Sequence, residues 1–134
     1  MEIPKVNLTE SSLKTVGFWY LATPYSGHPD GLLSAHQDAC EEAAVLILAG
    51  INVFCPIAHS HSIAINGGLN PLDYGIWMPA DEPFMNHAVG LLVSLMEGWS
   101  ESYGVLQEIK YFQKARKPIY ALEYPLQLPV EEDI

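Results

Sequence analysis

The sequence predicts a single α/β domain, a Rossmann-like or flavodoxin-like three-layer sandwich with a parallel sheet of four to five strands. Short apolar, β-prone runs alternate with segments of helical periodicity along the chain. This alternation favours right-handed β-α-β crossovers, which make neighbouring strands parallel. The length of 134 residues fits one domain with one core, and 49% hydrophobic against 16% charged residues is typical of a folding chain.

The first strand, helix and second strand follow one another between residues 16 and 56. The run VGFWYLA is β-prone and stops at Thr23, which predicts a strand followed by a loop. From Ser34 to Ala49 apolar residues recur at helical spacing, and Gly50 then ends the predicted helix as a C-terminal cap. The run INVFCP predicts a second buried strand that its proline terminates.

The middle of the chain has a weaker pattern. Residues 57–75 are predicted to form a long loop with a flexible tip at Gly67 and Gly68, and loops of this length are usually functional or mobile. The run WMPADEPFMNHA is helical in its second half, while Pro79 and Pro83 leave the start of that helix undefined.

A last helix lies between two further predicted strands. The run VGLLVSLM is strongly apolar, a helix is predicted from about Ser102 to Arg116, and KPIYAL follows as the fourth strand. We therefore predict one domain with a core at about residues 16–122. Residues 123–134 are expected to form a loose tail.

Charge argues against two classes of partner. The formal net charge is -10 at pH 7, and no Lys or Arg occurs between Lys14 and Lys110. Nucleic-acid polymers and anionic membranes are bound largely through basic side chains, so we expect neither as a partner. A single small phosphate could still bind at the amides of a helix N-terminus, which need no basic side chain.

The cysteines and the apolar runs indicate a cytoplasmic protein. Cys40 and Cys55 form no spacing motif and are predicted to be buried, small apolar residues in a reducing compartment rather than a disulfide. The longest apolar runs are too short to span a bilayer, and no basic segment precedes an apolar one at the start.

Three polar loops are predicted to meet at one edge of the sheet, after the first, second and third strands. Ligands of open α/β sheets bind beyond the carboxyl ends of the strands, beside helix N-termini. Glu108, four residues after Gly104, would lie in the first turn of a helix that begins there, with its carboxylate facing the crevice. The alternative is a solvated glutamate favoured by the helix dipole.

Four motifs in a fixed order carry a family resemblance: YLATPYSG, LAGINVFCP, GWSESYGVLQEI and KARKPIYAL. Over roughly residues 18–122 they resemble the nucleoside 2-deoxyribosyltransferase-like superfamily. The run Ser102, Gly104, Val105 and Glu108 is more similar to the nucleoside 5′-monophosphate N-glycosidases, in which a serine binds phosphate, than to the deoxyribosyltransferases. The resemblance implies hydrolysis or transfer at the N-glycosidic bond of a nucleoside or nucleoside 5′-monophosphate, no cofactor, no metal and a homodimer.

The resemblance also implies three catalytic residues. Glu108 matches the nucleophile that attacks the anomeric carbon, Asp81 falls near the acid that assists departure of the base, and Tyr20 matches the tyrosine of the first strand. Asp73 is a rival to Asp81 for the acid. The structural alternatives are a helix cap at Asp81 and an ordinary strand aromatic at Tyr20.

This chemistry needs two carboxyl groups in different protonation states. Cleavage of an N-glycosidic bond builds positive charge on the sugar, which an ionised carboxylate stabilises, while a protonated acid helps the base to leave. We expect the helix dipole to keep Glu108 ionised, and burial beside Trp77 or Phe84 to raise the pKa of Asp81.

One short segment is the predicted phosphate cradle. It combines Ser102, the amides of Tyr103 and Gly104, and Ser100, at the start of the last helix. It suits one phosphate rather than a di- or triphosphate, because no basic side chain compensates further charge. A plain N-cap is the alternative role of Ser102.

His59 and His61 form a His-x-His pair that would contact ligand or hydrogen-bond within its loop. A metal would need a further ligand, and the sequence offers no strong one. A binding module that senses a nucleotide-derived ligand without cleaving it remains the alternative function. Together, the predicted ligand-binding residues are Thr23, Pro24, Tyr25, His59, His61, Trp99, Ser100, Ser102 and Gly104.

Overall fold

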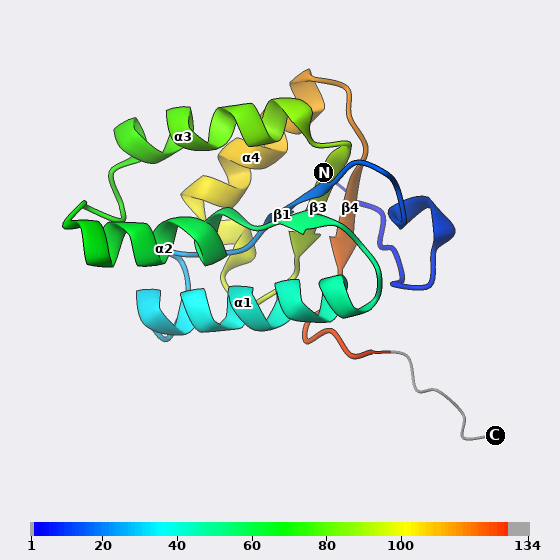
Figure 1. The fold of residues 1–134 in the computed structure, drawn as a ribbon, viewed down its shortest axis with the longest axis horizontal. Helices are drawn as coiled ribbons and strands as arrows, with labels where there is room; N and C mark the ends of the chain where they lie inside the picture. Colours follow the sequence, from blue (N-terminus) through cyan, green and yellow to red (C-terminus); the bar gives the residue numbers. More distant parts are fainter. Residues whose placement is uncertain (1, 129–134) are drawn as a thin grey trace.

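A computed structural model describes residues 2–128 and confirms the predicted α/β fold, with four strands in one all-parallel sheet. The strands are β1 (Trp19–Ala22), β2 (Val53–Phe54), β3 (Gly90–Ser94) and β4 (Ile119–Leu122), in the spatial order β2-β1-β3-β4. The helices are α1 (Leu32–Leu48), α2 (Pro56–Gly67), α3 (Tyr74–His87) and α4 (Tyr103–Lys114), with short 3-10 turns at Ser11–Leu13 and Trp99–Glu101. Figure 1 shows the helices arranged around this sheet.

Alternate residues of β1 separate the two faces of the sheet. Trp19 and Leu21 pack in a core cluster with α1, whereas Tyr20 and Ala22 pack in a second cluster with α3 and α4. The side-chain period of two along a strand produces this division. Both faces are therefore covered, which explains why β1 and β3 are buried throughout.

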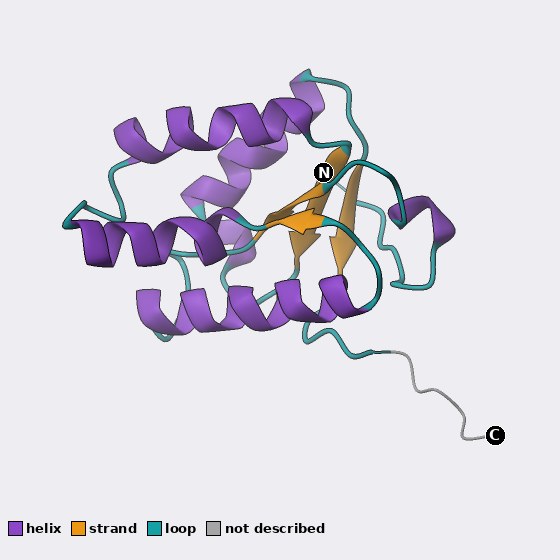
Figure 2. Ribbon diagram, viewed as in Figure 1, coloured by secondary structure: helices purple, strands orange, loops and turns teal. Residues whose placement is uncertain are grey.

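The strands are in register so that their carboxyl ends point to the same edge. Tyr20 pairs with Phe54 on one side and with Leu91 on the other, and Leu92 pairs with Tyr120. Figure 2 shows the parallel strand arrows and the helices packed around them. The loops that leave β1 and β3 and the start of α2 after β2 consequently lie at the same edge of the sheet.

The prediction of a long loop over residues 57–75 is wrong. Most of this segment is α2, which begins with Pro56 at its first position and ends at Gly68, a left-handed cap with φ 70°. Proline at the first helical position and glycine after the last are the normal boundaries of a helix. The predicted flexible tip at Gly67 and Gly68 is thus the capped end of a helix.

The helix that was predicted only in part, α3, starts earlier than its prolines suggested. Asp73 caps it, since the Asp73 side chain accepts a hydrogen bond from the Gly75 amide at 3.0 Å, and the helix continues through Pro79 and Pro83. At its other end Lys117 donates to the carbonyls of Met85, Asn86 and Ala88. These bonds supply partners to the last turn.

Two smaller expectations are also settled. Cys55 is buried as predicted, but Cys40 is exposed on α1; both thiols are free. Residues 123–128 contain no helix or strand, and the rest of the predicted tail, 129–134, lies outside the described residues. Within residues 2–128, no helix has both the length and the apolar character needed to cross a bilayer.

Candidate functional site

A cavity opens at the carboxyl edge of the sheet, where the predicted loops converge. The cavity has an open mouth, and its enclosed part measures about 40 Å³. This volume lies well below that of most small-molecule sites, about 300–1,000 Å³. The enclosed part alone holds only a few water molecules. Thirteen described residues line it: Thr23, Tyr25, Pro56, Ile57, Ser60, Pro71, Tyr74, Trp77, Met78, Asp81, Ser102, Gly104 and Glu108.

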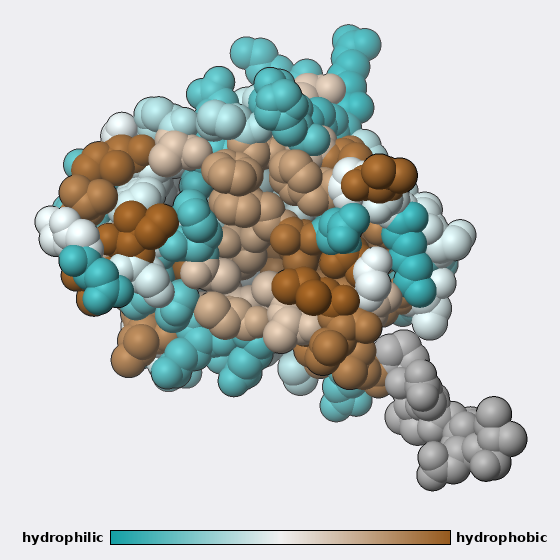
Figure 3. Space-filling view, in the orientation of Figure 1, coloured by the Kyte–Doolittle hydropathy of each residue, from teal (hydrophilic) through white to brown (hydrophobic). Residues whose placement is uncertain are grey.

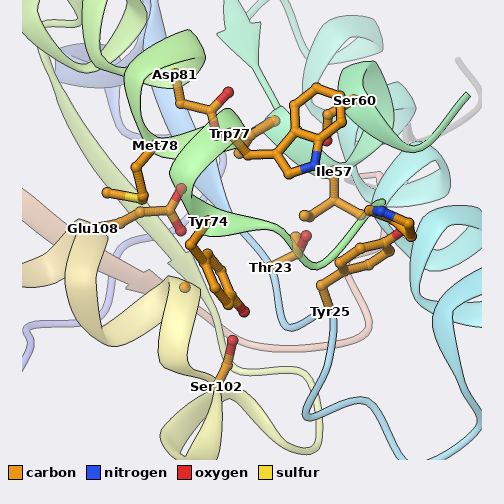
Figure 4. A pocket seen from close by; sticks show the side chains of 13 residues that line it. Thr23, Tyr25, Ile57, Ser60, Tyr74, Trp77, Met78, Asp81, Ser102 and Glu108 are labelled. Carbon is orange, nitrogen blue, oxygen red and sulfur yellow. The ribbon is translucent and has the colours of Figure 1, made fainter. Parts of the chain in front are cut away.

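Two buried carboxyl groups, Asp81 and Glu108, share this wall. Asp81 comes from α3 and is 9% exposed, and Glu108 comes from α4 and is 6% exposed. Figure 4 shows both side chains beside Met78 at one end of the cavity. The solvated alternative for Glu108 is therefore wrong. None of the thirteen described lining residues is Lys, Arg or His, so the site carries acid without a basic counterion.

The expected protonation state of Glu108 is wrong. Glu108 is the sixth residue of α4, in its second turn, where the helix dipole is weaker than in the first turn. Burial raises the pKa of Glu108 to about 8, the Tyr20 hydroxyl lowers it in part, and the negative charge of Asp81 raises it. Burial also raises the pKa of Asp81 to about 6, as expected for a buried acid.

Tyr20 lies next to the carboxyl pair without forming part of the cavity wall. Its side chain is fully buried between Phe54 and Phe112. Burial raises its pKa well above the usual value, and the charges of Glu108 and Asp81 raise it further. Although the hydroxyl lowers the pKa of Glu108, it has no hydrogen-bond partner of good geometry among the described residues.

Part of the predicted phosphate cradle reaches the cavity. Ser102 and Gly104 line it, while Ser100 is exposed and donates to Glu101 at 3.1 Å. Ser102 is also the N-cap of α4, because its hydroxyl accepts from the Val105 amide at 3.3 Å. The N-cap and cavity roles predicted for Ser102 thus coexist.

The two histidines of the His-x-His pair diverge, because they lie on α2 rather than on an extended segment. His61 is buried, and a 2.5 Å hydrogen bond joins its Nδ1 to the hydroxyl of Tyr25, which lines the cavity. His59 is exposed and packs against Phe54 and Phe84, outside the cavity wall. One histidine therefore supports the site indirectly and the other does not reach it.

Three other candidates lie away from the cavity wall. Pro24 is buried but does not line the cavity, whereas its neighbours Thr23 and Tyr25 do. Trp99 packs on the α3/α4 side of the core and lines a separate depression. Asp73, the rival acid, is an exposed helix cap, so the geometry favours Asp81 over Asp73.

The structure adds residues that the sequence did not indicate as binding residues. Ser60, Tyr74 and Met78 line the cavity because the segments that carry them are the helices α2 and α3. Pro56 at the start of α2 was the available signal, since proline there is typical of a helix start. Among residues 2–128, no group of three or more His, Cys, Asp or Glu side chains is arranged to hold a metal ion.

Comparison with known proteins gives a family match that covers most of the chain. Residues 17–124 match the family model described as Domain of unknown function (DUF1937). This span contains all four strands and all four helices, together with every residue that lines the cavity. A search of curated proteins gives no significant match.

Proposed function

Because this chain belongs to the DUF1937 family, whose description names no activity, we propose its function from the site itself. The proposed reaction is cleavage of the N-glycosidic bond of a nucleoside or nucleoside 5′-monophosphate, by hydrolysis or by transfer. One observation carries this proposal: Asp81 and Glu108 are buried in the wall of one cavity beside Tyr74 and Trp77.

The carboxyl pair has the charge that this reaction requires. The two groups are electrostatically coupled, so their protons belong to the pair rather than to either residue. With pKa values raised to about 6 and about 8, the pair holds one proton and one negative charge near neutrality. The proton can be donated to the leaving base, and the negative charge can stabilise the positive charge that develops on the sugar.

The likeness to the N-glycosidases supports a division of these roles. Positive charge that develops at C1′ favours the ionised form of the closer carboxyl group. We assign that role to Glu108, which bonds to C1′ or stabilises it. Asp81 then carries the proton to the departing base. Water, or a second base as acceptor, then attacks C1′. The bond between C1′ and Glu108 breaks, and its electrons return to the Glu108 carboxylate.

Aromatic and polar groups around the pair suit the rest of a nucleoside. Trp77 and Tyr74 provide ring surfaces for a base, and Thr23, Ser60 and Ser102 provide hydroxyl groups for the sugar. Because the enclosed part of the cavity is small, the ligand occupies the open mouth or displaces part of the wall.

Release of free base tests this proposal directly. The protein is incubated with nucleosides and 5′-monophosphates of each common base, and free base is measured by chromatography. Glu108→Gln should reduce release at least about a hundredfold, since it removes the charged group. Glu82→Gln, an exposed neighbour of Asp81, serves as the matched control. No release from any substrate, or an undiminished rate in Glu108→Gln, would refute the reaction.

Binding without cleavage is the second candidate, and the raised pKa of Glu108 favours it. A protonated, buried glutamic acid is a hydrogen-bond donor to a ligand rather than a nucleophile. In that case the same substrates bind to the protein while no base appears, and Glu108→Gln retains the affinity.

We also propose a homodimer. Exposed apolar side chains gather from the end of α2 to the start of α3: Ile63, Ile65, Leu69, Leu72 and Ile76. Figure 3 shows brown side chains at the left end of the molecule, where α2 leads into α3 in Figure 1. Multi-angle light scattering should give twice the monomer mass, and Ile65→Glu should restore the monomer.

A further inference from the structure

Tyr25 and His61 form a buried pair at the cavity wall that the proposed reaction does not use. Tyr25 is 7% exposed and lines the cavity from the loop after β1. Its hydroxyl lies 2.5 Å from Nδ1 of His61 on α2, which is also 7% exposed. A bond of this length between a hydroxyl and a ring nitrogen is at the short end of the hydrogen-bond range.

The surroundings of His61 disfavour its charged form. The His36 ring stacks on it at 4.5 Å between centroids, and Nδ1 of His36 donates to the Ile57 carbonyl at 3.2 Å. Cys40 lies beyond His36, with its Sγ 3.8 Å from Nε2 of that ring. Among the described residues, the titratable groups that hydrogen-bond to or stack on His61 are Tyr25, from the loop after β1, and His36, from α1; Cys40 contacts His36. Burial lowers the pKa of His61, and His36 lowers it further.

We propose that Tyr25 and His61 are a specificity-determining pair that selects a ligand carrying a hydrogen-bond donor. We assign neutral His61 the tautomer with its hydrogen on Nε2, in which Nδ1 accepts from the Tyr25 hydroxyl and the Tyr25 oxygen presents only lone pairs to the cavity. The nucleoside class of the ligand rests on the proposed function above. The pairing of Tyr25 with His61 rests on its own geometry, and its polarity rests on the assigned tautomer.

Protonation of His61 reverses that polarity. Nδ1 then carries a hydrogen and donates to the Tyr25 oxygen, and the hydroxyl hydrogen turns toward the cavity. A ligand group that donated a hydrogen bond to the Tyr25 oxygen near neutrality then faces the hydroxyl hydrogen of Tyr25, which is also a donor. Affinity for such a ligand should therefore fall as His61 takes up a proton.

The same polarity discriminates against phosphate. A phosphate dianion has acceptors only, and near neutrality it would meet the lone pairs of Tyr25 and a charged carboxyl pair at Asp81 and Glu108. In Figure 4, Tyr25 lies across the cavity from Glu108. The donor thus belongs to a part of the ligand remote from C1′, either the 5′-hydroxyl or an amino group of the base.

Ligand affinity as a function of pH tests the pair. Dissociation constants for adenosine, 5′-deoxyadenosine, purine riboside and adenosine 5′-monophosphate are measured by calorimetry between pH 5 and 8, in protein carrying Glu108→Gln to prevent turnover. We expect adenosine to bind at least about tenfold more weakly at pH 5 than at pH 8. Loss of affinity for 5′-deoxyadenosine identifies the 5′-hydroxyl as the donor, and loss for purine riboside identifies the base amine.

Substitutions of Tyr25 and His61 test whether the hydrogen-bond polarity of the pair, rather than its packing, determines ligand affinity. His61→Gln keeps an acceptor that cannot titrate, so adenosine should bind with little pH dependence. Tyr25→Phe should bind weakly at every pH, and His87→Gln, an exposed histidine at the end of α3, should behave like the parent. An unaltered pH dependence in His61→Gln, or full affinity in Tyr25→Phe, would overturn the proposal.

Failure of this proposal and failure of the proposed reaction give different results. If nucleosides bind with the expected pH dependence but wild-type protein releases no base, the pair stands and the reaction falls. If base is released but His61→Gln leaves the pH dependence unchanged, the reaction stands and the pair falls. If none of the four compounds binds at any pH, and wild-type protein releases no base from any substrate, both proposals fall.

Discussion

Asp81 on α3 and Glu108 on α4 face one cavity, and the charge of Asp81 raises the pKa of Glu108. The two residues are 27 positions apart in the chain and belong to different helices. Each carboxyl group is buried, so each is costly to ionise, and ionisation of one makes ionisation of the other more costly. This coupling leads to predictions about charge, and the surrounding structure leads to predictions about stability.

Asp81→Asn should lower the pKa of Glu108 toward its ordinary value, because it removes the neighbouring negative charge while leaving the burial unchanged. Carbon-13 spectroscopy of the glutamate carboxyl groups follows this titration. The same variant should release base at least about tenfold more slowly if Asp81 supplies the proton. Glu82→Gln, with its exposed side chain, should leave both measurements unaltered. A Glu108 titration that does not move in Asp81→Asn would contradict the coupling.

Tyr20→Phe should raise the pKa of Glu108 further and leave the fold at least as stable. The hydroxyl lowers the Glu108 pKa, yet it is buried without a hydrogen-bond partner of good geometry among the described residues. Removal of an unsatisfied buried hydroxyl relieves a desolvation cost of about 1 kcal/mol or more. Urea unfolding at pH 6 measures the free energy of unfolding, with Tyr120→Phe on the opposite face as control. A marked loss of stability would show that the hydroxyl has a partner.

Glu42→Gln should stabilise the protein at pH 8 but not at pH 4. Glu42 on α1 is 3% exposed, accepts a hydrogen bond from Ser94 at 2.6 Å, and burial raises its pKa to about 7. Because the folded protein holds this proton more tightly than the unfolded chain, stability falls as pH rises from the ordinary value of 4.5 toward about 7. Ionisation over this interval costs roughly 1–3 kcal/mol.

Thermal unfolding of the Glu42 variant across pH provides the measurement. Glutamine can still accept from Ser94 and carries no charge, so the decline in Tm with rising pH should become smaller. We expect the remaining decline in Tm with rising pH to come from ionisation of Asp81 and Glu108, because burial raises their pKa values as well. Glu41→Gln, which is exposed, should reproduce the wild-type profile. An undiminished decline in Glu42→Gln would count against this assignment.

Gly98→Ala should destabilise the fold by about 2 kcal/mol or more. Gly98 has φ 94°, where a side chain is strained, and an added Cβ would collide with the carbonyl oxygen of Gly27. This contact joins the loop that carries Tyr25 to the turn that leads to Ser102. Gly67→Ala in α2, where the added carbon meets nothing, should be neutral or stabilising. Equal unfolding midpoints in urea for the two variants would refute the prediction.

The strands and the first helix could be predicted from the sequence because their patterns are local. The apolar runs of β1 and β3 and the periodicity of α1 are each complete within one segment. The helix α2 was missed because its apolar face is weak and its many polar residues resemble a loop. The start of α3 was missed because its two prolines suggested an interrupted helix, although the Asp73 cap and the packing of Met85 stabilise it.

Some features of the candidate site could be predicted from the sequence, and others could not. Glu108, Tyr25 and Ser102 were predicted because their residue types and their places after strands suggested a shared crevice, whereas Asp81 was predicted from the family resemblance. The hydrogen bond between Tyr25 and His61 could not be predicted, because it joins residues 36 positions apart. The protonation state of Glu108 was predicted wrongly, since burial outweighs the helix dipole in the second turn of α4.

By itself, the sequence determined an acidic α/β domain with parallel strands, because strand and helix patterns are written in neighbouring residues. It also determined which polar segments follow the strands. Only the tertiary structure decided that two acids from different helices share one cavity and that a tyrosine meets a histidine at its wall. Those relationships depend on burial and on distances between remote segments, and both arise only when the helices pack on the sheet.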